Sequence, residues 1–180
     1  SDINMIFKVN ANLANELGNL CQRTLSLVYK NCQQSVPSCG ELAESDEVLL
    51  DNAKGLLERA TAAIEVQAIQ KYVEILVTMI VDTNKYIDEQ APWVLRKENP
   101  ERMNTVLYVI MEVLRYTAIL YQPIIPESAG KILDQLTVPH DCRTFLHLTD
   151  EYSIQPGATI SKPQGIFPRI EVPEELLQSS

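Results

Sequence analysis

The sequence predicts an all-α fold, a bundle of about five helices with an extended C-terminal tail packed across it. Apolar residues recur at helical spacing through most of the first 136 residues. The first helix shows this in one stripe: Leu13, Leu17, Leu20, Thr24, Leu27 and Val28. Prolines and polar loops separate the periodic segments, and the periodicity is lost after Pro139. Long amphipathic segments joined by short loops favour a helical bundle.

The helices are expected at residues 3–32, 45–63, 66–89, 100–121 and 127–136. Ser45 is the expected N-cap of the second helix. Pro92 should end the third helix, because a residue before proline avoids helical geometry, and Pro92 can then open the next turn. The third helix is expected to bury one face: Ile69, Tyr72, Val73, Leu76, Ile80, Thr83 and Ile87.

The chain of 180 residues is long enough for one domain with a sizeable core. We expect residues 1–150 to form a helical domain and residues 151–180 to form the tail of the same unit. The tail is rich in proline and glycine, and Ile166, Phe167 and Ile170 are its expected apolar anchors. A short terminal helix is expected within residues 173–178.

Charge and composition narrow the function. A net charge of −9 argues against broad, non-specific binding to nucleic acids. The acids are unevenly spread, however, and Arg96, Lys97 and Arg102 lie close to Trp93 in the sequence. A mildly basic face on an acidic body suits a few specific base contacts. No run of 18 apolar residues is present, so we expect no membrane partner. We expect the protein to be cytoplasmic.

Few residues point to metal or catalytic chemistry. The four cysteines lack paired Cys-x-x-Cys spacing, which predicts reduced thiols and no zinc site. His140, Cys142 and His147 offer too few ligands for a metal. No phosphate-binding glycine loop and no Ser/His/Asp set is evident. We therefore predict no catalytic residue, metal or cofactor in these 180 residues.

The strongest functional signal combines Trp93 with two polar residues of the first helix. Trp93 is the only tryptophan and follows Pro92 at a helix break. Asn19 and Arg23 are one turn apart, and they lie with Asn12 roughly 80–120° from the core direction of their helix. An aromatic ring can stack on an unpaired RNA base while an amide and a guanidinium bond its edge. The simpler interpretations are that Asn19 and Arg23 lie on a solvated helix flank and that Trp93 is buried in the core.

Three segments resemble a known family. They are residues 88–93 (DEQAPW) with Lys97 after them, residues 13–20 (LANELGNL) with Arg23, and residues 167–171 (FPRIE). In this order they resemble the anticodon-binding domain of the methionyl-tRNA synthetases, which are class I aminoacyl-tRNA synthetases. The similarity extends from about Val9 to Glu171.

The resemblance implies roles for individual residues. Trp93 would stack on the anticodon, while Asn19 and Arg23 would bond its first base, a cytosine. Pro92 would fix the ring, and Asn12 and Lys97 would support RNA binding, with Lys30 and Lys85 as weaker candidates. The implied partners are the CAU anticodon stem-loop of methionine tRNA and an N-terminal catalytic domain of the same protein. That domain would bind ATP with Mg²⁺ and methionine; its motifs, His-x-Gly-His and Lys-Met-Ser-Lys-Ser, do not occur here.

Other interpretations stay open at this point. The chain could be the anticodon domain of another class I synthetase, for leucine, valine, isoleucine or cysteine. It could be a helical protein-interaction module with Trp93 as its binding anchor. It could also be a small helical enzyme that uses Asp82, Asp88 or Glu89 near Trp93.

Overall fold

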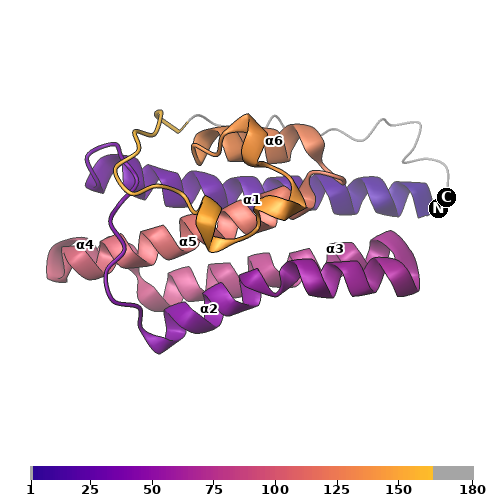
Figure 1. Cartoon of the computed structure of the whole chain (residues 1–180), viewed down its shortest axis with the longest axis horizontal. Coiled ribbons are helices and arrows are strands. Elements are labelled where there is room, and N and C mark those ends of the chain that lie inside the picture. Colours follow the sequence, from indigo (N-terminus) through magenta and orange to yellow (C-terminus); the bar gives the residue numbers. More distant parts are fainter. Residues whose placement is uncertain (1, 164–180) are drawn as a thin grey trace.

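The computed structural model describes residues 2–163, and the side chains of residues 12–62 and 69–163. It confirms an all-α bundle (Figure 1). The elements in order are α1 (Asp2–Asn31), α2 (Glu44–Lys54), α3 (Leu56–Gln90), α4 (Pro92–Glu98), α5 (Pro100–Tyr121) and α6 (Pro126–Gln135), followed by the 3₁₀ turns η1 (His140–Cys142), η2 (Phe145–His147) and η3 (Asp150–Tyr152).

Helix α5 is the centre of the bundle. It contacts α1, α2, α3, α4 and α6, and in Figure 1 it runs between α1 with α6 on one side and α2 with α3 on the other. It is long and apolar enough to cross a membrane by length and composition, but 89% of its apolar stretch is buried inside the bundle, as in a core helix. Two charged residues of α5 pair inside the bundle. Arg115 Nε donates to Glu112 Oε2 at 2.9 Å, and their side chains are 0% and 6% exposed.

The first helix buries the stripe that the sequence predicts. Leu13, Leu17, Leu20 and Val28 are at most 2% exposed, and Leu27 is half-buried. Burying a side chain of this size stabilises the fold by about 1.5–3 kcal/mol. Helix α1 packs against α3, α4, α5 and α6. Asn12, Asn19 and Arg23, which lie off the buried stripe, are exposed.

The predicted division between the second and third helices is wrong. The break lies at Gly55, not near residue 64, and α3 therefore begins at Leu56. Glycine is the poorest helix former after proline, which explains a break there without a change of apolar period. The predicted N-cap is also wrong. Ala43 is the N-cap of α2, and the Asp46 carboxylate accepts the Ala43 N–H at 2.8 Å.

The predicted buried face of α3 is right except for Ile69, which is 64% exposed. The hydroxyl of Tyr72 donates to the carbonyl of Leu120, so α3 is level with the end of α5 at this point. Ile69 lies one turn before Tyr72 along α3. A helical pattern in the sequence does not reveal where the neighbouring helix ends.

The described part of the tail has no α-helix after α6 and packs along the loop that follows α1. The N–H of Val36 donates to the carbonyl of Ala158 at 2.8 Å, and the N–H of Gly157 donates to the carbonyl of Val36 at 2.8 Å. Ile154 and Ile160 are buried. The predicted anchors Ile166, Phe167 and Ile170 and the predicted helix at 173–178 lie outside the described residues. The division at residue 150 stays a prediction.

All four cysteines are free thiols. Burial raises the pKa of the Cys21 thiol to about 12 and that of Cys32 to about 11. Both thiols are therefore protonated at neutral pH, and neither is a ready nucleophile.

Candidate RNA-binding site

The junction of α3 and α4 presents Trp93 at the surface. Ala91 has φ 48° and ψ 63°, which ends α3, and its N–H still donates to the carbonyl of Ile87 at 2.9 Å. Pro92 is buried and is the first residue of α4, as predicted. Trp93 follows it and is 38% exposed. The left-handed residue and the proline together turn the chain, so the indole lies outside the core.

Helix α1 brings a cation onto this ring. The guanidinium carbon of Arg23 lies 4.9 Å from the centre of the Trp93 ring, within cation–π range. Arg23 Nη2 also bonds Asp88 Oδ1, near the end of α3, at 3.0 Å. Three helices thus meet in one cluster, which we call the Arg23–Trp93 face: Arg23, Asp88, Trp93 and the neighbouring Asn19.

The polar partners predicted from the sequence take different places. Asn19 is exposed one turn before Arg23 on the same flank of α1. Asn12 is also exposed, but it lies seven residues before Asn19, about 10 Å nearer the N-terminus of α1. Lys97 is exposed on α4, one turn after Trp93. The structure therefore brings Arg23 and Trp93 into contact and keeps Asn19 beside them, while Asn12 is more distant.

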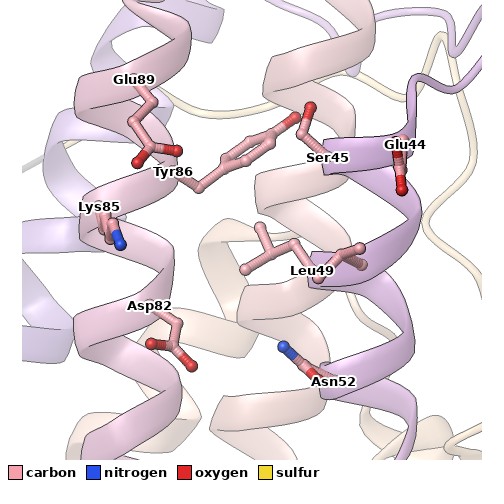
Figure 2. A pocket seen from close by; sticks show the side chains of 9 residues that line it. Glu44, Ser45, Leu49, Asn52, Asp82, Lys85, Tyr86 and Glu89 are labelled. Atoms are coloured by element: carbon pink, nitrogen blue, oxygen red, sulfur yellow. The ribbon is translucent and has the colours of Figure 1, made fainter.

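Lys85 lies elsewhere. It lines a groove of about 480 Å³ between α2 and α3, together with Glu44, Asp82 and Glu89 (Figure 2). These neighbours are mainly acidic, which is a poor setting for an RNA phosphate. Of the three carboxylates that the enzyme interpretation offered as alternatives, Asp82 and Glu89 line this groove, whereas Asp88 pairs with Arg23.

The chemistry of the Arg23–Trp93 face suits a single-stranded base. The indole is a flat apolar platform, and stacking on it tolerates any base. A guanidinium has five N–H donors, of which Asp88 accepts one, so Arg23 retains donors for a base edge. Its side chain is 42% exposed and that of Asp88 is 66% exposed. An ion pair this open is worth at most about 1 kcal/mol and can be exchanged for another partner.

The sequence did not reveal the role of Asp88 in this cluster. Asp88 is 65 residues from Arg23, and no local pattern links them. The one available signal was its opposite charge in the same short segment as Trp93. Gln90, next to the Ala91 turn, was not singled out, and Arg102 was named only for its charge near Trp93 in the sequence.

Comparisons with known proteins bear on the whole chain. The profile of the family described as the anticodon binding domain of methionyl tRNA ligase matches residues 36–176, which include Trp93 but not α1. The methionine–tRNA ligase of Mesorhizobium japonicum is 43% identical over 92% of this chain. That of Mycobacterium bovis is 45% identical over 97% of the chain, so α1 is covered there.

Solved structures show similarity to the same family. The free-state crystal structure of Mycobacterium tuberculosis methionyl-tRNA synthetase matches 96% of this chain and 35% of its own, with a TM-score of 0.85 and 45% identity. A second structure of that synthetase, bound by methionyl-adenylate, matches 89% of this chain and 32% of its own, with a TM-score of 0.83.

This chain spans about a third of the length of the curated relatives it matches. The family match identifies the methionine enzyme, and not the leucine, valine, isoleucine or cysteine enzymes, among the class I alternatives. It also favours RNA recognition over the interaction-module and enzyme interpretations. The chain belongs to the family of anticodon-binding domains of methionyl-tRNA ligases.

Proposed function

We propose that this chain reads the CAU anticodon of methionine tRNA as the anticodon-binding part of a methionine–tRNA ligase. The observation that carries the proposal is the contact between Arg23 and Trp93, at 4.9 Å, on an exposed face built from three helices. Family membership gives the class of RNA, and this contact gives the place where a base would bind.

In this proposal Trp93 supplies affinity for the RNA, and the polar side chains select the base. Trp93 stacks on an anticodon base, which supplies affinity without selecting the base. Asn19 and Arg23 bond the edge of the first base, cytosine, and a wrong base leaves these polar groups unpaired. In this proposal Pro92 fixes the ring, and the exposed Lys97 and Asn12 contribute supporting contacts to the RNA.

The whole protein that we propose is a cytoplasmic ligase of which this chain is one part. Its catalytic domain would bind ATP with Mg²⁺ and methionine and would join methionine to the tRNA. In the described residues, no group of His, Cys, Asp and Glu is placed to hold a metal ion. The proposal places that chemistry in the catalytic domain.

The proposal is tested by titrating the 180-residue chain with an anticodon hairpin that bears CAU. Replacing the first base, C, should weaken binding by about 1–3 kcal/mol. Trp93→Ala should weaken binding to every loop sequence by about 1–3 kcal/mol. Asn19→Ala should mainly reduce discrimination at the first base.

Matched controls separate RNA binding from general damage. Tyr152 is an aromatic residue with the same exposure as Trp93, 38%, and lies in η3. Tyr152→Ala and the exposed Asn52→Ala should leave hairpin affinity unchanged. Equal binding of CAU and first-base variants by the wild-type chain would refute the proposed specificity, and full affinity in Trp93→Ala would refute the assigned platform.

A further inference from the structure

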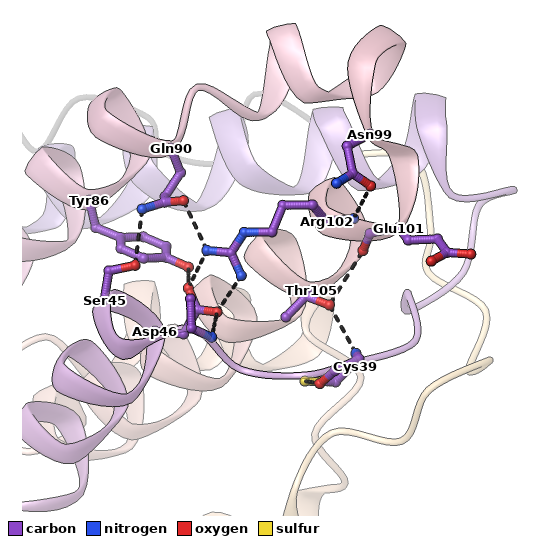
Figure 3. Close-up of polar contacts among 11 residues, drawn as sticks. Cys39, Ser45, Asp46, Tyr86, Gln90, Asn99, Glu101, Arg102 and Thr105 are labelled. Carbon is purple, nitrogen blue, oxygen red and sulfur yellow. Dashed lines mark hydrogen bonds and ion pairs between the residues drawn. The ribbon is translucent and has the colours of Figure 1, made fainter.

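The helices that precede and follow α4 are joined by a partly buried hydrogen bond. Gln90 is the last residue of α3, and Arg102 lies in the first turn of α5 (Figure 3). Arg102 Nη2 donates to Gln90 Oε1 at 2.9 Å. The seven residues of α4, Trp93 among them, therefore lie between two side chains that hold each other.

Arg102 is itself held in the bundle by a buried carboxylate. Arg102 Nη2 donates to Asp46 Oδ1 at 2.8 Å, and Nη1 bonds Oδ2 of the same group. The Asp46 side chain is fully buried, and it also accepts the Tyr86 hydroxyl and the Ala43 N–H. Because this carboxylate is surrounded by donors from three elements, Arg102 has a fixed position in the fold. We call Asp46, Tyr86, Gln90 and Arg102 the Arg102 clamp.

The segment between the clamp residues is one that needs support. Ala91 has a positive φ of 48°, which L-residues other than glycine adopt only when the surroundings hold them there. Gln90 precedes it directly, and its amide also donates to Ser45 Oγ at 3.2 Å. Gln90 is thus bonded on both sides, to α2 and to α5, next to the turn that aims Trp93.

We infer that Gln90 and Arg102 are positioning residues, which set the orientation of Trp93 for stacking through the Ala91 turn and not by touching RNA. This inference rests on the proposed function and extends it to a set of residues on α2, α3 and α5. It explains why an exposed tryptophan follows a left-handed alanine: the turn is held by the Arg102 clamp on one side and by α1 on the other.

The experiment uses Trp93 as its own reporter, since it is the only tryptophan of the 180-residue chain. Gln90→Met keeps the length of the side chain and removes both hydrogen bonds. Gln90→Glu keeps the oxygen that faces Arg102. Gln70→Met makes the same change at an exposed position of α3 far from α4. Each variant is studied by acrylamide quenching and anisotropy of Trp93 without RNA, by thermal unfolding, and by titration with the CAU hairpin.

In Gln90→Met, acrylamide should quench Trp93 more efficiently, and the anisotropy should fall. The melting temperature should drop by less than about 4 °C, because the side chain that loses its two hydrogen bonds is only partly buried. The Kd for the hairpin should rise about tenfold, because part of a stack is lost. Gln90→Glu should restore both the fluorescence and the affinity, and Gln70→Met should match the wild type. A merely structural role would change the melting temperature without this pattern.

The two arms of the experiment answer different questions. Wild-type fluorescence in Gln90→Met, or wild-type affinity despite altered fluorescence, would overturn the positioning role. A wild-type chain that does not distinguish the CAU hairpin from a mismatched one would overturn the proposed function. In that case the fluorescence of Gln90→Met and Gln90→Glu still decides whether the clamp orients the indole.

Discussion

Two Asp–Arg pairs flank α4. They consist of the same residue types but differ in burial, in geometry and in the groups around them. Asp46 and Arg102 have side chains that are 0% and 20% exposed, and their contact is bidentate. Asp88 and Arg23 are 66% and 42% exposed, and they share a single bond. The buried pair is surrounded by further donors, whereas the open pair lies against Trp93. The same two residue types thus make a fixed support on one side of α4 and an exchangeable contact on the other.

The largest difference between the pairs should be in stability. Asp46→Asn leaves the Arg102 guanidinium without its counter-charge and should lower the free energy of unfolding by about 3 kcal/mol. Urea denaturation of the variant and the wild type measures this. A loss below about 1 kcal/mol, which is the range of an exposed pair, would show that the buried pair does not support the fold as described.

Tyr86→Phe should weaken the same support by a smaller amount. It removes the hydroxyl that donates to Asp46 Oδ1 and should cost about 1.5–3 kcal/mol, the range for a hydrogen bond to a charged group. The variant is chosen because phenylalanine keeps the ring that fills the same space. Urea denaturation at neutral pH is again the measurement, with Tyr29→Phe, a half-buried tyrosine of α1, as the control.

The loss of stability in Tyr86→Phe should depend on pH, because the pKa of Asp46 is shifted in the folded protein. Burial alone raises the pKa of Asp46, but the hydrogen bonds from Arg102, Tyr86 and Ala43, with the Arg102 charge, outweigh it and lower that pKa below its usual value. The pair's stabilisation is therefore present above the unfolded-state pKa of Asp46 and is lost as the pH falls through the folded-state pKa. Without the Tyr86 hydroxyl the pKa is less depressed. The deficit of Tyr86→Phe should thus be largest at neutral pH and narrow in acid; a deficit that stays constant would contradict this account.

Much of the fold follows from local signals in the sequence. Pro100 and Pro123 bracket α5, and the predicted range matches the observed one. Pro92 sets the break before α4 for a steric reason that needs no tertiary context. The boundary predicted near residue 64 but found at Gly55 was missed for a different reason. The apolar period continues across the glycine, so periodicity alone does not show that the helix is interrupted there, although glycine is a poor helix former.

The site was predictable only in part. Trp93 and Arg23 stand out as residue types, and the structure places them in contact; their role in RNA binding stays a prediction. The support behind them could not be read from the chain. Asp46 and Arg102 are 56 residues apart, and Gln90 becomes a partner only because α5 returns past the end of α3. Long-range pairs of this kind depend on helix packing, which local periodicity does not encode.

A smaller effect concerns the turn between the two pairs. Ala91→Gly should raise the free energy of unfolding by about 0.5–1 kcal/mol, because relief of the left-handed strain exceeds the added entropy of the unfolded chain. The matched control is Ala118→Gly in the interior of α5, which should destabilise. If the Arg102 clamp rather than residue 91 orients Trp93, the quenching of Trp93 in Ala91→Gly should stay close to that of the wild type.

The smallest effect should come from the open pair. Asp88→Asn should change the free energy of unfolding by no more than about 0.5 kcal/mol, and the change should vanish in 1 M salt because solvent and ions screen exposed charges. Denaturation at low and high salt measures it, beside Asp46→Asn, whose cost should persist in salt. A large, salt-insensitive loss in Asp88→Asn would mean that Arg23 is locked in place as Arg102 is. A near-zero cost is what the proposed RNA binding at this face requires, since Arg23 would then exchange a carboxylate for a base edge while the fold that presents Trp93 stays unchanged.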